Sequence, residues 1–279
     1  GVNDNNRILV PENSTLREAL SNPLSWTDAY QQVNNYNEAD WQTNIWAADV
    51  IYNEKMGKYC YYASSSVWGT PGSVIWFATS DNIEGPYIFE NCIVYSGFNN
   101  KTNDGKYYSR VNSLHYSFTN ISDLFKNGLL TSDEIKNAPW FNVDGDYDHT
   151  VYPNCIDPAL FYDADDRLWM AYGSYFGGTY IMPLNEKTGL PDYEYMRNHE
   201  GYDIYFGKKI VATTFANDLS GEGAYIEYDK TSGFYYLFIS YHGKHHSVKR
   251  RCHHIATYHS IFKNKKIQKK SILYACRWI

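Results

Sequence analysis

The chain has 279 residues, a formal net charge of −6 at pH 7 and many aromatic residues, led by 28 tyrosines. No stretch reaches the ~20 consecutive apolar residues that a membrane-spanning helix needs, and residues 1–6 are too polar to begin a signal peptide. The five cysteines lack the spacing of a metal site, and their odd number argues against a complete disulfide framework. These features argue against a membrane protein and predict a globular chain with one large domain or two small ones.

Helices are expected to be few and short. In a capping box, a Thr side chain and a Glu three residues later each bind the other's backbone amide at the start of a helix. Two such boxes occur, Thr15–Leu16–Arg17–Glu18 and Thr131–Ser132–Asp133–Glu134. Elsewhere aromatic and β-branched residues alternate with polar turns, which predicts strands.

Three segments repeat one pattern. Each begins with an acidic residue, continues as a short apolar strand and a polar turn, and ends in a second aromatic strand. The segments are residues 49–64, 157–174 and 222–240. Further strand-like sequence follows each segment. Repeated hairpins with additional outer strands are typical of the blades of a β-propeller.

The acid that opens each repeat is the candidate for function. Asp157 is the clearest case, because it lies between Ile156 and Pro158 where an apolar strand begins. The innermost strands of propeller blades line one axis, so residues at equivalent places in different blades converge. Asp49, Asp157 and Glu222 are therefore expected around one axial pocket, where two carboxyl groups could act on the same bond.

These segments resemble glycoside hydrolase family 43, and within it the endo-acting 1,5-α-L-arabinanases, which are five-bladed propellers. The resemblance covers about residues 40–242. Its motifs are Trp46–Ala47–Ala48–Asp49–Val50, Ile156–Asp157–Pro158, Tyr172–Gly173–Ser174 and Gly221–Glu222–Gly223–Ala224–Tyr225–Ile226. It implies an all-β, five-bladed β-propeller within residues 1–242 that is incomplete at both ends. Part of blade one and blades two to four are expected, with blade five missing or scrambled.

The resemblance also implies an inverting mechanism, in which a base activates water and an acid protonates the leaving oxygen, with their carboxyl groups roughly 6.5–9.5 Å apart. Glu222 matches the general acid, and Asp157 matches the residue that modulates the pKa of the acid and orients it. The candidates for substrate binding are Asn154, Ser174, Trp46 and Gly173. Asp49 is expected mainly to organise its blade, and Trp46 has core packing as an alternative role. Glu84 is followed by Gly and Pro as in a related motif, but it is expected in an exposed outer turn.

Two departures from the family pattern stand out. The general base of the family lies in a His-Asp-Pro-like motif upstream of Trp46, and no such motif is present, so the chain is expected to begin inside blade one. The resemblance also ends near residue 242. Residues 243–279 carry ten Lys and Arg and no Asp or Glu. We interpret this basic, His-rich tail as sequence foreign to the family; a metal site and a basic arm for nucleic acid are the alternatives.

The implied function is hydrolysis of internal α-1,5-L-arabinofuranosidic bonds in arabinan, a pectin side chain, by a secreted monomer without nucleic acid or membrane partners. The chemistry needs no cofactor, although family members carry a metal ion near the axis, here expected to be structural calcium. Because no base is found, the activity of this chain is open. The alternatives are an exo-acting α-arabinofuranosidase or β-xylosidase of the same family, and a carbohydrate-binding propeller without catalysis.

Overall fold

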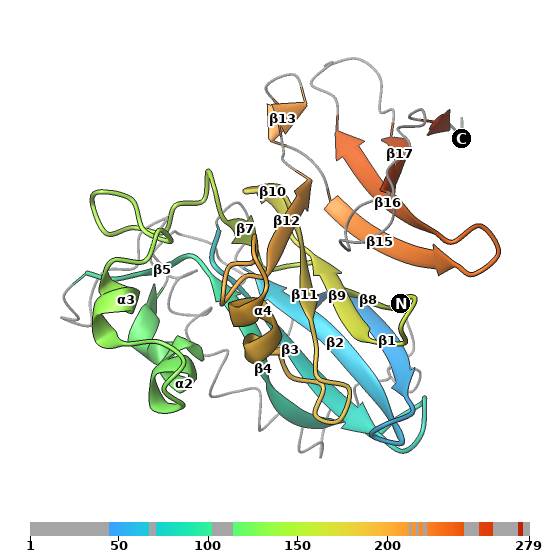
Figure 1. Ribbon diagram of the computed structural model, residues 1–279, viewed down its shortest axis with the longest axis horizontal. Coiled ribbons are helices and arrows are strands. Elements are labelled where there is room, and N and C mark those ends of the chain that lie inside the picture. Colours follow the sequence, from blue (N-terminus) through green and yellow to red (C-terminus); the bar gives the residue numbers. More distant parts are fainter. Residues whose placement is uncertain are drawn as a thin grey trace, which may run out of the picture.

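The computed structural model describes residues 45–66, 71–101, 114–211, 214–215, 218–219, 222–242, 251–258 and 273–275. This part of the chain is mostly β-structure, and its largest units are three four-stranded antiparallel sheets (Figure 1). Among these residues, no helix combines the length and the apolar character needed to cross a membrane.

Each of the three sheets is a meander of neighbouring strands. The first sheet contains β1 (Ile45–Asn53), β2 (Lys58–Ser66), β3 (Ser73–Ser80) and β4 (Ile88–Ser96). The second sheet contains β8 (Ala159–Tyr162), β9 (Leu168–Tyr172), β11 (Thr179–Pro183) and β12 (Lys208–Val211). The third sheet contains β15 (Glu222–Asp229), β16 (Phe234–His242), β17 (Arg251–Tyr258) and β18 (Leu273–Ala275). The three hairpins predicted from the repeats are confirmed as the pairs β1–β2, β8–β9 and β15–β16.

The remaining strands are two or three residues long, and the helices are short. The short strands are β5 (Phe98–Asn99), β6 (Leu114–His115), β7 (Pro153–Asn154), β10 (Ser174–Phe176), β13 (Thr214–Phe215) and β14 (Asp218–Leu219). The helices are η3 (Tyr116–Phe118), α2 (Ile121–Lys126), α3 (Ser132–Lys136) and α4 (Tyr193–Asn198). The capping box predicted at Thr131 and Glu134 is confirmed at the start of α3. The box predicted at residues 15–18 lies outside the described residues.

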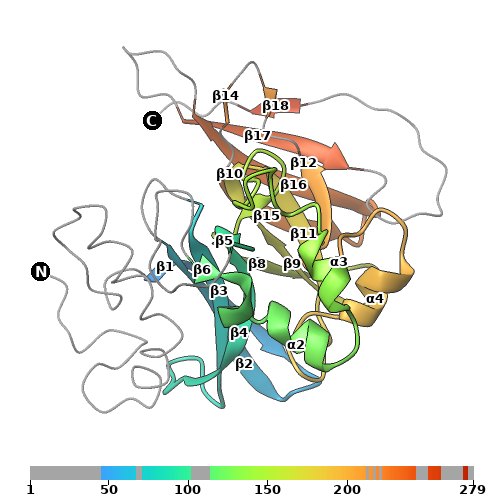
Figure 2. The ribbon, with the colours of Figure 1, turned by 90° about the vertical axis from the view of Figure 1, so that its left-hand side faces the viewer.

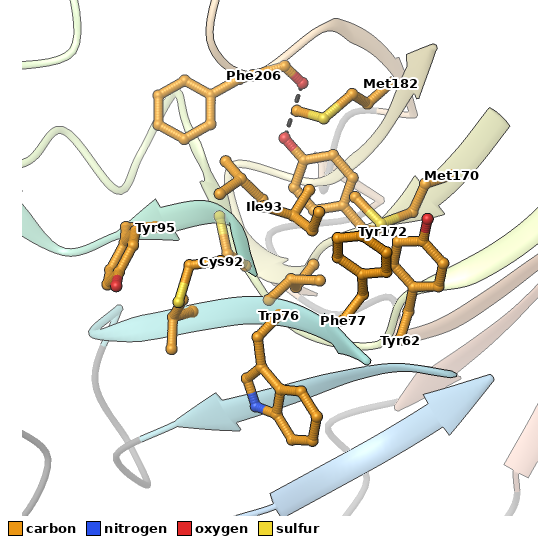
Figure 3. Close-up of a cluster of buried hydrophobic side chains, with 14 of the residues drawn as sticks. Tyr62, Trp76, Phe77, Cys92, Ile93, Tyr95, Met170, Tyr172, Met182 and Phe206 are labelled. Carbon is orange, nitrogen blue, oxygen red and sulfur yellow. Dashed lines mark hydrogen bonds between the residues drawn. The ribbon is translucent and has the colours of Figure 1, made fainter. Parts of the chain in front are cut away.

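A buried aromatic core joins the first two sheets (Figure 3). Tyr62 of β2 stacks on Phe77 of β3 and donates its hydroxyl hydrogen to the carbonyl oxygen of Gly189 at 2.7 Å. Tyr172 of β9 donates in the same way to Phe206, also at 2.7 Å. Tyr hydroxyls that are buried with a partner add specificity to the apolar contact. Helices α2 and α3 contribute to this core. They lie on the side of the molecule away from β15 and β16 in Figure 1 and in front of the sheets in Figure 2.

A second, smaller core joins the second and third sheets. Its members are Phe161, Trp169, Ala171, Ile181, Ile210, Ala224, Ile226, Leu237 and Ile239. Along β15 the buried residues alternate with exposed ones, as expected for a strand with one face on the core. As a result β8 contacts both β1 and β15, so the first strands of the three sheets are successive neighbours.

The third sheet extends into the segment predicted as a foreign tail. The backbone of β17 pairs with β16 from Tyr235 opposite Tyr258 to His242 opposite Arg251, and β18 pairs with β17. This gives the third sheet the strand order of a complete four-stranded unit. The domain boundary at residue 242 stays a prediction, and within the tail the structure describes the backbone of β17 and β18. The ring of five blades also stays a prediction, because the described elements supply three such sheets.

Candidate active site

The first strand of each sheet begins with a one-residue bulge. In β1 the register shifts between Trp46 and Asp49, and in β15 it shifts between Glu222 and Tyr225. In both cases three residues of the first strand oppose two residues of its partner. A bulge of this kind bends the strand and redirects the side chains beside it.

The segment that enters β8 has the same geometry. The carbonyl oxygen of Ile156 accepts the N–H of Gly173 at 2.9 Å, whereas Ala159, three residues later, pairs with Ala171. The second residue of each bulge has a positive φ, which is 28° at Ala47, 55° at Asp157 and 62° at Gly223. Asp is one of the few residues besides Gly that tolerates this region.

This shared bulge corrects the alignment of the repeats. Glu222 occupies the first position of its bulge, Asp157 the second and Asp49 the fourth. The prediction that the three acids hold equivalent places is therefore wrong by one to three residues. An alignment that starts at the acids misses the extra residue, because only the backbone pairing reveals it.

Asp157 and Glu222 nevertheless lie together. The Oδ2 atom of Asp157 accepts the backbone N–H of Gly223, the residue after Glu222, at 3.0 Å. Burial raises the pKa of Asp157, the hydrogen bond from Gly223 opposes this shift, and repulsion from the Glu222 carboxylate adds to it. These two acids thus lie beside each other where two sheets begin, and the axial pocket expected around them stays a prediction. Their chemical roles stay a prediction.

Asp49 makes the corresponding contact between the first two sheets. Its Oδ2 atom accepts the backbone N–H of Leu160 in β8 at 2.7 Å, and its Oδ1 atom accepts the N–H of Val50 at 2.8 Å. Burial raises the pKa of Asp49 and these two hydrogen bonds lower it. Both carboxylate oxygens are thus bound to the backbone, in agreement with the organising role expected for this residue.

Asn154 and Ser174 pair with each other in the small sheet of β7 and β10, and both side chains are buried. The Oδ1 atom of Asn154 accepts hydrogen bonds from the hydroxyls of Ser73 and Ser96, at the ends of β3 and β4. Asn154 therefore links the small sheet of β7 and β10 to the first sheet. The Ser174 hydroxyl has no hydrogen-bond partner among the described residues, which is a costly state for a buried polar group.

Gly173 has a backbone reason to be glycine. Its φ is 99°, and a Cβ atom there would lie 2.5 Å from the carbonyl oxygen of Gly178. Trp46 is partly buried, and its carbonyl oxygen accepts the hydroxyl of Ser64 at 3.1 Å. Trp46 and Glu222 hold the same position in their respective bulges.

Tyr225 is a residue that the sequence reasoning missed. It lies three residues after Glu222 on β15 and is 47% exposed; burial raises its pKa, and the charges of Glu227 and Asp49 add to this shift. The available signal was its place in the Glu222 motif. An aromatic ring with one exposed side beside two carboxyl groups provides a surface on which a sugar ring can stack.

The described residues contain no group of three or more His, Cys, Asp or Glu side chains that could hold a metal ion. The calcium ion expected from the resemblance stays a prediction. No chemical step is assigned to a metal. The upstream residues that could supply a general base lie within residues 1–44, outside the described part.

The neighbouring first strands of two sheets bring an Asp and a Glu together, as the resemblance to glycoside hydrolase family 43 predicted. No family model matches the chain. The chain is 32% identical over 243 residues to the extracellular endo-α-(1→5)-L-arabinanase of Thermotoga petrophila, covering 87% of the chain and 38% of that protein. The crystal structure of the endo-1,5-α-L-arabinanase from this organism matches with a TM-score of 0.55 at 30% identity. The match covers 92% of the present chain and 43% of that chain. The glycoside hydrolase family 43 YxiA protein of Bacillus licheniformis matches with a TM-score of 0.56 at 25% identity. This match covers 92% of the present chain and 42% of that chain.

These matches confirm the resemblance seen in the sequence. The chain is related to glycoside hydrolase family 43 and is similar to its endo-1,5-α-L-arabinanases over most of its length. The chain spans about two fifths of the length of the curated relatives that it matches.

Proposed function

We propose that the chain hydrolyses internal α-1,5-L-arabinofuranosidic bonds of arabinan, with Glu222 as general acid and Asp157 as the residue that orients it. The observation that carries this proposal is the hydrogen bond from the Gly223 amide to Asp157. This bond holds the Asp157 carboxyl group beside the start of β15, where Glu222 lies. Relatives named as extracellular endo-arabinanases support the substrate class and action outside the cell. Their similarity also supports a five-bladed propeller for the complete fold.

The proposed reaction begins with proton transfer. Repulsion from the Glu222 carboxylate is one of the causes that raise the pKa of Asp157, after burial. Glu222, on the first residue of β15, is proposed to deliver a proton to the leaving glycosidic oxygen. Asp157 stays bound to the Gly223 amide and fixes the direction of that transfer. Inversion then requires a water molecule on the opposite face of the sugar, and no residue is assigned to activate it.

Substrate contacts are proposed at the aromatic and polar groups around the two acids. Tyr225 and Trp46 offer ring surfaces, and the buried Ser174 is proposed to shape the wall of the subsite. Asn154 and Gly173 are proposed to shape the subsite through the backbone that they hold. The protein is proposed to act as a monomer.

The test is hydrolysis of linear α-1,5-arabinan by the full chain, followed by reducing-end release and product length. Substitution Glu222→Gln is expected to lower the rate by roughly 10²–10⁴-fold, the usual effect of losing a general acid. Glu227→Gln is the matched control, because Glu227 is exposed on the same strand β15, and it should keep the wild-type rate. Oligosaccharides as early products indicate internal cleavage, whereas arabinose alone would contradict it. Arabinan binding without turnover by the wild type would contradict the hydrolase proposal as a whole.

A further inference from the structure

The outer edge of β8 is held by a carboxylate. In the second sheet β8 pairs with β9 on one side, and its other edge faces β1 and β15. The backbone N–H groups on such an edge need partners from outside the sheet. Asp49 supplies one at Leu160, at 2.7 Å, within the range of a short charge-assisted hydrogen bond.

The same kind of contact recurs one strand further. Asp157 lies three residues before Leu160, and its carboxylate accepts the N–H of Gly223 at the start of β15. Two carboxylates thus connect three first strands in sequence, from β1 to β8 and from β8 to β15. Glu222 lies at the end of this series, directly before Gly223.

We propose that Asp49 is a positioning residue for the reaction: by holding β8 at Leu160, it places the Asp157 carboxylate against the bulge that carries Glu222. This inference rests on the proposed function, because it concerns the same pair of acids. Each oxygen of Asp49 already accepts a backbone amide, from Leu160 or from Val50. Asp49 therefore acts through the strand it holds and not on the sugar.

The geometry makes a specific demand on position 49. An Asn side chain has one acceptor oxygen, so it can accept the backbone N–H of Leu160 or that of Val50 but not both. Its NH₂ group, a donor, would face the remaining N–H. A Glu side chain keeps two acceptor oxygens but is longer by one methylene. Asp49→Asn should therefore disturb β8 more than Asp49→Glu does.

The first measurement separates rate from affinity. Asp49→Asn is expected to lower kcat about 10–100-fold, since misplacement of reacting groups by ~1 Å costs up to about this much, with KM changed less than about threefold. Asp49→Glu should recover part of the loss. Asp81→Asn is the control, because Asp81 is exposed in the turn after β3 and pairs with Lys58 on the surface; it should leave kcat unchanged. Equal kcat values in the wild type and Asp49→Asn would overturn the proposal.

The second measurement does not depend on catalysis. Amide hydrogen exchange is followed at Leu160 and Gly223 in the full chain. Asp49→Asn should speed exchange at both amides, whereas Asp157→Asn should speed it at Gly223 alone. Faster exchange at Leu160 with Gly223 unchanged would show that Asp49 acts only locally and would overturn the proposal. If Asp49→Asn does not fold, Asp49→Glu should show the same order with smaller changes. If the wild type does not cleave arabinan, the proposed function fails while the exchange pattern still tests the linkage.

Discussion

Replacement of Asn154 separates the role predicted from the sequence from the role that the structure shows. The sequence placed Asn154 at the substrate, whereas its Oδ1 atom is buried and accepts hydrogen bonds from Ser73 and Ser96 of the first sheet. Asn154→Ala leaves the Ser73 hydroxyl without this buried acceptor, which costs about 1–3 kcal/mol. The small cavity left behind adds about 1 kcal/mol.

The expected sum is roughly 2–4 kcal/mol, which corresponds to a fall of about 5–15 °C in the melting temperature of a domain of this size. Thermal unfolding followed by far-UV circular dichroism measures it, beside KM for arabinan. Asn198→Ala is the control, since Asn198 is exposed at the end of α4, and its melting temperature should match the wild type. An unchanged melting temperature for Asn154→Ala together with a raised KM would refute the structural role and restore the substrate contact.

Three further predictions concern the frame around the site. Asp203 is partly buried and accepts the Trp140 indole N–H at 2.8 Å, and desolvation raises its pKa above the ordinary 3.8. Asp203 therefore stays protonated to a higher pH in the folded state than in the unfolded state. The stability of the folded state consequently falls as pH rises from about 4 through the raised pKa. The melting temperature of Asp203→Asn relative to that of the wild type should rise over the same pH interval. Gly177→Ala places a Cβ atom 2.1 Å from the Tyr152 carbonyl oxygen, and it should lower the unfolding free energy in urea by at least about 1–3 kcal/mol. Thr131→Ala removes the cap of α3 and should cost about 0.5–2 kcal/mol in the same assay.

Local patterns predicted the units of the fold. Each hairpin lies within one short stretch of sequence, so the period of its apolar residues and its polar turn were sufficient. The capping box at Thr131 could be read for the same reason, since both partners lie within one turn. Glu84 was also assigned correctly, because it is exposed in the turn between β3 and β4.

The register of the site could not be read in this way. A bulge adds one residue to a strand without changing its composition, and at Ala47 the left-handed residue is not even a glycine. The partners of Asn154 are similarly hidden, since Ser73 precedes it by 81 residues. The sequence patterns therefore indicated which polar residues stand in apolar surroundings. The binding partner of each of these residues depends on tertiary contacts that the patterns do not contain.

Asp157 and Glu222 are proposed to act on one sugar linkage. The most direct measurement is a crystal structure of the Glu222→Gln variant of the full chain with a bound arabino-oligosaccharide. We expect a glycosidic oxygen within about 2.6–3.2 Å of the substituted side chain at position 222, with the Asp157 carboxylate still accepting the Gly223 amide. An oligosaccharide bound away from both residues, or a linkage beyond the reach of position 222, would contradict it.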